Sequence, residues 1–171
     1  MRLNCVLAIT LGIGAAAHAL GTGDAAPEFE AATTAGPVKL DDLRGKWVVL
    51  MFYPKSFTPG CTKEACSVRD AYEKLAARGV AVFGISVDDL ETQKKFKAAH
   101  QLPYELIADR DKKIAQAYGV LAPMGLFALR RTFVIAPDGR IAHVSDSVSV
   151  ATHGDDLLGV LENLQSKAQA K

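Results

Sequence analysis

The sequence predicts an α/β fold with a mixed central β-sheet flanked by helices. Short apolar runs rich in β-branched and aromatic residues alternate with amphipathic segments whose apolar residues recur every three or four positions, which indicates strands followed by helices. Late in the chain, Asp138-Gly139 joins two further apolar runs, which indicates an antiparallel hairpin. Because strands connected by helices run parallel and a hairpin runs antiparallel, the sheet is expected to be mixed.

The first 19 residues have the pattern of a secretory signal peptide, which we expect to be cleaved. Arg2 gives a basic start, residues 6–17 are apolar, and Ala17-His18-Ala19 is a small-x-small cleavage site. The alternative is an uncleaved anchor, because residues 3–20 carry no formally charged side chain and approach the length of a membrane span. Cleavage would leave residues 20–171 as one domain, exported to a bacterial periplasm and without stable membrane insertion.

Composition limits the functions open to this chain. It holds 20 Lys and Arg against 19 Asp and Glu, so no charge bias favours a nucleic acid or an anionic membrane as partner. Cleavage would leave 152 of the 171 residues, which is enough for one compact domain. It would also remove Cys5 and leave only Cys61 and Cys66. A single cysteine pair in an exported protein could form an ordinary structural disulfide.

The first cysteine of this pair is expected at the start of a helix. The run 47–53 is too short for a typical helix and rich in β-branched and aromatic residues, which predicts a buried strand. Over 59–78 the apolar residues recur at helical spacing, with Thr58 as a candidate N-cap and Gly79 as the stop. Cys61 then lies in the first turn, where unpaired backbone N–H groups and the helix dipole favour a thiolate.

The remaining elements follow from the same patterns. Asp88 and Asp89 are expected to open a second amphipathic helix. In chain order we also expect a short hairpin within 24–39, a helical turn over 40–45, strands over 80–87 and 102–108, a short helix over 111–118, an apolar loop over 120–129, strands over 131–136 and 141–144, and a final helix over 154–169.

The residues around Cys61 resemble a known active-site signature. The string Pro54-x-x-x-Thr58-x-x-Cys61 is similar to that of peroxiredoxins, and its extension to Glu64-Ala-Cys66 resembles the peroxiredoxin Q, or bacterioferritin comigratory protein, subfamily. Similar strings at 23–29, 83–87 and 130–135 extend the resemblance over nearly the whole chain after the N-terminus. It implies a thioredoxin-like fold and a thiol-dependent peroxidase that reduces hydrogen peroxide and organic hydroperoxides in antioxidant defence, without a cofactor or a metal.

The resemblance also implies roles for both cysteines. Cys61 would attack the peroxide and become a sulfenic acid, and Cys66 would resolve it as an intramolecular disulfide. Thioredoxin is the family's usual reductant, whereas an exported enzyme would need an extracytoplasmic dithiol protein. The expected partners are therefore a peroxide and such a reductant, and the protein is expected to be a monomer.

A cation is expected beside Cys61, because a helix start alone contributes only about 0.3–1 kcal/mol in exposed settings. Peroxiredoxins supply an arginine from a later strand, and Arg130 and Arg131 are both candidates. Side chains alternate along a strand, so at most one of the two faces the site. The family's arginine stands three residues before a Phe, here Phe133, which selects Arg130. Arg131 departs from the small residue often found at its position.

Three more residues have both a structural and a functional interpretation. The Thr58 hydroxyl could cap the helix or hydrogen-bond the thiolate and the peroxide, and the resemblance favours the second role. Pro54 would shield the thiolate from water. Glu64 could orient the site arginine, as the resemblance implies, or it could be an exposed first-turn carboxylate favoured by the helix dipole. Both interpretations of Glu64 remain open.

The two cysteines cannot bond to each other while they share an intact helix. Residues five apart on an α-helix have Cα atoms roughly 8.7 Å apart, whereas a disulfide needs a Cα separation of about 4.4–6.8 Å. We therefore predict a continuous helix in the reduced protein and unwinding of its first turns on oxidation.

Two other classes of protein remain as alternatives. A thioredoxin-like disulfide reductase would normally carry Cys-x-x-Cys, and this chain has four residues between its cysteines. A copper metallochaperone of the thioredoxin-like type would combine a cysteine pair with a distant histidine, for which His100, His143 and His153 are available.

Overall fold

The computed structural model describes residues 19–170, so nearly all of the predicted signal peptide lies outside the described residues. None of the described helices is both long and apolar enough to cross a membrane. The strands are β1 (Glu30–Thr33), β2 (Gly36–Lys39), β3 (Trp47–Phe52), β4 (Val80–Ser86), β5 (Glu105–Ala108), β6 (Arg131–Ile135) and β7 (Ile141–Ser145). The helices are α1 (Pro59–Ala77), α2 (Leu90–His100), α3 (Lys113–Ala117) and α4 (His153–Gln169), with 3-10 turns η1 (Asp41–Leu43) and η2 (Pro123–Gly125).

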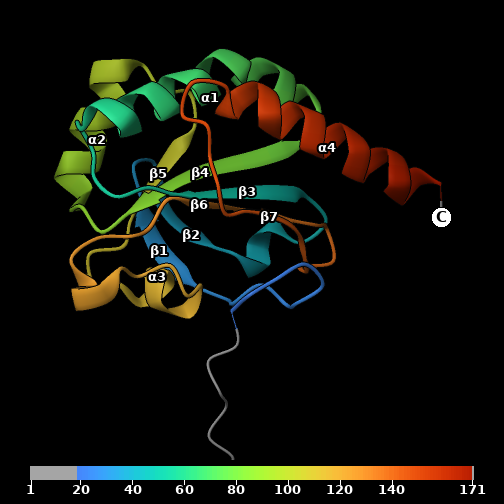
Figure 1. The fold of residues 1–171 in the computed structure, drawn as a ribbon, viewed down its shortest axis with the longest axis horizontal. Coiled ribbons are helices and arrows are strands. Elements are labelled where there is room, and N and C mark those ends of the chain that lie inside the picture. The colour runs from blue at the N-terminus through green and yellow to red at the C-terminus, as the bar shows by residue number, and fades with distance from the viewer. Residues whose placement is uncertain (1–18, 171) are drawn as a thin grey trace, which may run out of the picture.

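These strands form one mixed sheet in the order β2-β1-β5-β4-β3-β6-β7 (Figure 1). β3, β4 and β5 are parallel neighbours, whereas β6 runs antiparallel to β3 and β7 runs antiparallel to β6. The N-terminal hairpin of β1 and β2 extends the other edge, because β1 pairs antiparallel with β5. The expected α/β fold with a mixed sheet between helices is confirmed.

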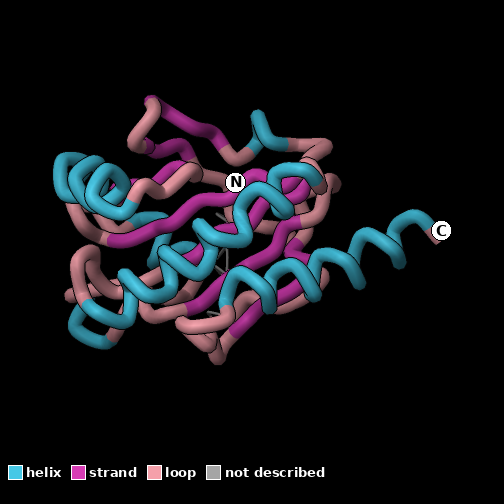
Figure 2. The backbone as a smooth tube through the Cα atoms, turned by 90° about the horizontal axis from the view of Figure 1, so that it is seen from above, coloured by secondary structure: helices cyan, strands magenta, loops and turns pink. Residues whose placement is uncertain are grey.

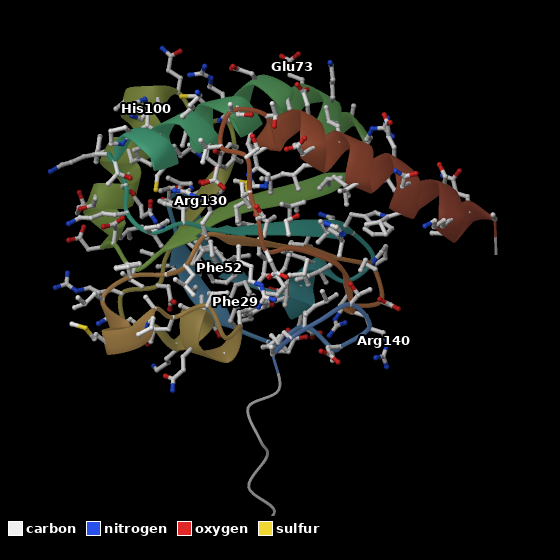
Figure 3. All side chains as sticks on the ribbon, viewed as in Figure 1. Phe29, Phe52, Glu73, His100, Arg130 and Arg140 are labelled. Atoms are coloured by element: carbon white, nitrogen blue, oxygen red, sulfur yellow. The ribbon has the colours of Figure 1, made fainter. Side chains whose placement is uncertain are left out.

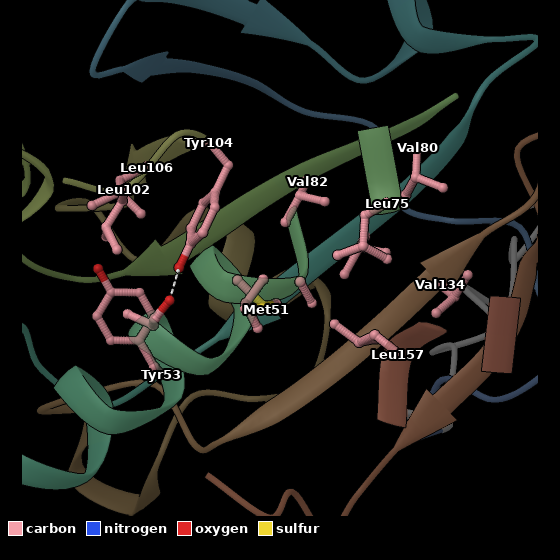
Figure 4. Close-up of a cluster of buried hydrophobic side chains, with 14 of the residues drawn as sticks. Met51, Tyr53, Leu75, Val80, Val82, Leu102, Tyr104, Leu106, Val134 and Leu157 are labelled. Atoms are coloured by element: carbon pink, nitrogen blue, oxygen red, sulfur yellow. Dashed lines mark hydrogen bonds between the residues drawn. The ribbon is translucent and has the colours of Figure 1, made fainter. Parts of the chain in front are cut away.

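Alternation along β3 divides the core into two layers. Val49 and Met51 point to the face covered by α1, α2 and α4, whereas Leu50 and Phe52 point to the face covered by α3 and the N-terminal segment (Figure 1). Figure 2 shows α1 and α4 lying side by side across the sheet. Figure 4 shows the apolar cluster on this face, where side chains of both helices join those of the central strands. Of these helices, α1 carries three residues of the candidate site, Cys61, Glu64 and Cys66.

Among the predicted elements that are shorter in the structure are the strand β5 and the helix α3. β5 begins only at Glu105, because the chain just before it still forms the end of α2. Gln101 is in the left-handed conformation, and the Leu102 N–H donates to the Lys97 carbonyl of α2. α3 covers only the middle of the predicted range 111–118. Its first turn is fixed by Asp109, whose carboxylate accepts two backbone N–H groups of this helix at 2.8 and 3.1 Å.

Candidate active site

Cys61 lies in the first turn of α1, directly after the loop that leaves β3. Thr58 has the extended backbone of an N-cap residue, Pro59 is the first helical residue, and the Thr62 N–H donates to the Thr58 carbonyl at 2.9 Å. Cys61 is only 2% exposed. The predicted helix start is confirmed, so the thiol lies where the first-turn N–H groups of α1 lack helical partners.

Contacts with α2 and with the segment after β4 hold the loop before α1. Phe57 has a left-handed backbone (φ 65°), which is uncommon for a residue other than glycine, and its ring packs edge-on against Phe96 at a centroid distance of 5.2 Å. The Ser56 N–H donates to Asp88 Oδ2 at 2.8 Å. Asp88 therefore anchors this loop instead of opening α2, and Asp89 is the residue whose carboxylate caps that helix.

Arg130, labelled in Figure 3, brings a positive charge to Cys61 from just before β6. Its Nη2 donates to Cys61 Sγ at 3.2 Å, and its Nη1 forms an ion pair with Glu64 Oε2. Arg131, the other candidate, is directed elsewhere and pairs with Asp146. Adjacent residues thus point in different directions, as alternation requires, and Arg130 is the arginine that contacts the thiol.

Glu64 is a buried residue of α1, with its side chain only 4% exposed. Besides Arg130 it meets His153 of α4, whose Nδ1 lies 3.0 Å from Glu64 Oε1. A buried carboxylate needs such partners, because an unpaired charge in the interior is strongly destabilising. The interpretation of Glu64 as an exposed first-turn carboxylate is wrong, because the start of α4 covers it.

Pro54 and Thr58 lie in the loop that leads into α1. The Thr58 hydroxyl donates to the Lys55 carbonyl at 2.9 Å, so its side chain does not cap the helix. Its oxygen can still accept a hydrogen bond. Pro54 is half-buried and lines an open groove together with Leu126 and Phe127. Capping by the Thr58 side chain, one of its two predicted interpretations, is therefore wrong.

Cys66 lies half-buried in the same helix as Cys61, and both cysteines are free. α1 is continuous through both, as predicted for the reduced protein. Beside Cys66, the Tyr104 hydroxyl donates to the Ala65 carbonyl at 2.9 Å (Figure 4). Burial raises the pKa of Tyr104, so this hydroxyl stays a neutral donor. Because an intact helix separates the two sulfurs, a bond between them requires α1 to open.

His153 also belongs to this site, although its place in the sequence suggested only a copper ligand of the metallochaperone alternative. It is 2% exposed at the first position of α4. Burial lowers the pKa of His153 to about 4, opposed by the Asp156 carboxylate and assisted by the nearby Arg130, so the imidazole is neutral near neutral pH. The sequence could have predicted that His153 is buried, because it stands four and eight residues before Leu157 and Leu161 and residues four apart share one helix face.

No metal centre is present among the described residues, where no group of three or more His, Cys, Asp or Glu side chains could hold an ion. The histidines considered for copper, His100, His143 and His153, lie on α2, β7 and α4. This scatter does not favour the metallochaperone alternative, and the four residues between the cysteines do not favour the disulfide reductase.

Comparison with known sequences gives a consistent family. The sequence profile of the AhpC/TSA family matches residues 22–144. A putative peroxiredoxin bcp of Coxiella burnetii is 41% identical over 146 residues, covering 81% of this chain and 97% of the relative. Peroxiredoxin Bcp of Bacillus subtilis is 38% identical over 152 residues, covering 85% of this chain and 97% of the relative.

Solved structures share the fold. The crystal structure of peroxidoxin BcpB from Mycobacterium tuberculosis superposes with a TM-score of 0.77 at 36% identity, covering 84% of this chain and 97% of that one. A bacterioferritin comigratory protein of Xanthomonas campestris, described for its alkyl peroxide reduction activity, has a TM-score of 0.73 at 28% identity, with 84% and 92% covered. The thioredoxin-like fold of peroxiredoxins, expected from the resemblance, is therefore confirmed.

The sequence relatives and the solved structures both match this chain across most of their own length. The similarity therefore extends well beyond the short signature around Cys61. The chain belongs to the AhpC/TSA family, within its Bcp and peroxiredoxin Q group, and it is a thiol-dependent peroxidase.

Proposed function

We propose that Cys61 is the thiolate that attacks the peroxide and that Cys66 resolves the product. The Cys61 sulfur takes the terminal oxygen of ROOH and becomes a sulfenic acid, while the remaining RO⁻ takes a proton and leaves as ROH. The Cys66 thiol then displaces water and forms the disulfide. The observation that carries this assignment is the 3.2 Å contact between Arg130 Nη2 and Cys61 Sγ in the first turn of a helix.

The neighbouring residues take supporting roles in the proposal. The Arg130 cation stabilises the thiolate and, later, the negative charge on the departing oxygen. Glu64 holds the guanidinium by its ion pair. The Thr58 oxygen accepts a hydrogen bond from the incoming hydroperoxide. Pro54 shields the thiolate from water.

We propose further that the mature enzyme is an exported monomer that starts at residue 20. The basic start, apolar stretch and Ala17-His18-Ala19 motif support removal of the first 19 residues and a periplasmic location. The disulfide must be reopened by a dithiol protein, either thioredoxin or, outside the cytoplasm, a thioredoxin-like reductant that attacks one of the two sulfurs.

One experiment tests the central assignment. The reduced chain from residue 20 onward is mixed with one equivalent of hydrogen peroxide or an organic hydroperoxide, and free thiols and intact mass are followed. We expect both thiols to disappear and the mass to fall to that of an internal disulfide. Retention of both thiols, together with tight binding of Cu(I) by the cysteine pair, would instead support the metallochaperone.

A further inference from the structure

His153 is a buried polar side chain that the proposed reaction does not yet use. Its Nε2 lies 3.2 Å from the Thr132 hydroxyl oxygen of β6, and its Nδ1 lies 3.0 Å from Glu64 Oε1 of α1. The imidazole therefore lies where α1, α4 and the sheet meet. A polar group this deeply buried destabilises the fold unless both of its nitrogens are satisfied, so these two contacts need an explanation.

Close packing at Gly154 brings His153 to this place. A Cβ atom on Gly154 would lie 2.3 Å from the Ser67 carbonyl oxygen and 2.7 Å from the Ala71 Cβ, so the first turn of α4 touches the backbone of α1. The Gly154 N–H also donates to Ser67 Oγ at 3.0 Å. Ser67 lies about one helical turn after Glu64 in α1. The contact of Gly154 with Ser67 therefore places His153, the residue before Gly154, against the Glu64 carboxylate.

The facing atoms of Glu64 and His153 have unused hydrogen-bonding capacity. Glu64 Oε1 and His153 Nδ1 are both fully buried, and neither has a well-directed hydrogen bond to another described residue. Only 3.0 Å separates them, so a small rotation of the imidazole would complete the bond between them. With Nδ1 as the donor to Glu64, Nε2 accepts from the Thr132 hydroxyl, which fixes the tautomer.

We propose that His153 is a positioning residue for peroxide reduction: its Nδ1–H holds one oxygen of Glu64, so that the other oxygen holds Arg130 with Nη2 directed at the Cys61 sulfur. The contacts form a continuous path from Thr132 through His153, Glu64 and Arg130 to the thiolate. This role rests on the proposed function of Cys61.

A neutral imidazole suits this role better than a charged one. The charged groups that face His153 are Glu64 from α1, Arg130 from the chain before β6 and Asp156 from α4 itself. Burial lowers the pKa of His153 to about 4, and the Glu64 charge is already neutralised by Arg130. A neutral donor fixes Glu64 without competing with Arg130 for its negative charge, so the guanidinium keeps its carboxylate partner.

The test measures the thiol and not only the fold. In a Cys66→Ser background, where Cys61 is the single thiol of the mature chain, the rate of alkylation is followed against pH and the oxidation by hydrogen peroxide is timed. We expect His153→Leu to raise the alkylation midpoint and to slow oxidation about tenfold, the scale of coupling within one hydrogen-bond network. His153→Asn, whose amide N–H can replace Nδ1–H, should restore both toward the parent values.

Two controls separate positioning from packing. Leu161→Ala, two turns further along α4, should lower the thermal stability while leaving the alkylation midpoint of Cys61 unchanged. If His153→Leu fails to fold, His153→Gln serves instead, because its longer amide can keep the contact with Thr132 and lose the one with Glu64. In an Arg130→Ala background, His153→Leu should produce no further change of the midpoint, since the proposed path runs through Arg130.

The outcomes are distinct. A midpoint that is unchanged or lowered in His153→Leu, or a shift of equal size in the Arg130→Ala background, would overturn the positioning role while leaving the proposed function intact. Peroxidase activity that survived in Cys61→Ser would instead overturn the proposed function itself.

Discussion

Arg130 donates a 3.2 Å hydrogen bond from Nη2 to the sulfur of Cys61, although 69 positions of the chain separate the two residues. The same guanidinium holds Glu64, which lies between the two cysteines in α1. In the proposed mechanism, the first turns of α1 unwind to let the cysteines approach, which would separate Cys61 and Glu64 from Arg130. We therefore expect the arrangement that stabilises the Cys61 thiolate and the arrangement that forms the disulfide to exclude each other.

The two cysteines should differ in the step that they control. Cys61→Ser should abolish peroxide consumption, because Cys61 has the helix-start position and the contact with Arg130. Cys66→Ser should still react once and stop as a sulfenic acid, which a dimedone adduct in the mass spectrum would reveal. A first oxidation that requires Cys66 and not Cys61 would reverse the two roles.

The paired arginines provide an internal control for the electrostatics. Arg130→Ala should raise the pH midpoint of Cys61 alkylation and slow peroxide oxidation roughly tenfold to a hundredfold, the range for losing one hydrogen bond to a charged group. Arg131→Ala should have a much smaller effect, since Arg131 pairs with Asp146. Alkylation profiles in the Cys66→Ser background measure both, and a shift confined to the Arg131 variant would exclude our choice.

Disulfide formation should melt the start of α1. We expect amide hydrogen exchange over residues 62–70 to rise when the protein is oxidised, because Cα atoms roughly 8.7 Å apart must close to about 4.4–6.8 Å. Exchange in α4 beyond its first turn serves as the reference. Equal protection of 62–70 in the reduced and the disulfide-bonded protein would contradict local unfolding.

Gly60 should control how easily that unwinding happens. A Cβ atom there would lie 3.6 Å from Arg130 Nη2, an ordinary contact, so Gly60→Ala should fit the reduced structure. Alanine stabilises a helix over glycine by about 0.8–1 kcal/mol, which should slow disulfide formation about fivefold. A slower resolving step leaves the sulfenic acid exposed for longer, so more Cys61 should reach sulfinic acid at high peroxide.

Gly159 of α4 provides the matched control for this change. A Cβ atom at Gly159 would meet no other atom within 4 Å, and α4 does not have to open between the cysteines. Gly159→Ala should therefore stabilise the fold without altering the yield of sulfinic acid, measured by intact mass. The idea fails if both alanine variants slow the resolving step equally.

Stability should fall as the pH is lowered through the range that His153 governs. The pKa of His153 is about 4 in the folded protein, against its ordinary value of 6.5. Below about pH 6.5, His153 becomes protonated in the unfolded chain but stays neutral in the folded protein. The free energy of unfolding therefore falls toward pH 4 by up to about 3 kcal/mol. Above that range this contribution is constant.

Urea titrations at several pH values measure this dependence. His153→Asn cannot titrate there, so its stability should vary less between pH 6.5 and 4 than that of the parent protein. The same substitution at His143, on β7 and partly exposed, is the control and should keep the parent slope. A parent slope retained in His153→Asn would exclude burial of a neutral imidazole.

Local sequence patterns determined the helix that carries the thiol. The apolar run before residue 54, the Thr58-Pro59 start and the Gly79 stop each act within a few residues of the chain, and the structure has α1 between them, with Gly79 in the left-handed conformation that favours glycine. Alternation along a strand also required that Arg130 and Arg131 diverge. The α/β class followed from the same short-range signals.

Contacts between distant segments decided the rest. The helical pattern around Glu64 fits an exposed or a buried carboxylate equally well, and only the packing of α4 at Gly154 buries it. Asp88 could open a helix by its position, but its carboxylate is taken by the Ser56 N–H. His153 shares a helix face with Leu157, but only the close approach of α4 to α1 places that face against Glu64. The burial and the partners of these side chains depend on which surfaces pack together. The free energy of that packing comes from contacts between distant segments and cannot be read from any single stretch of sequence.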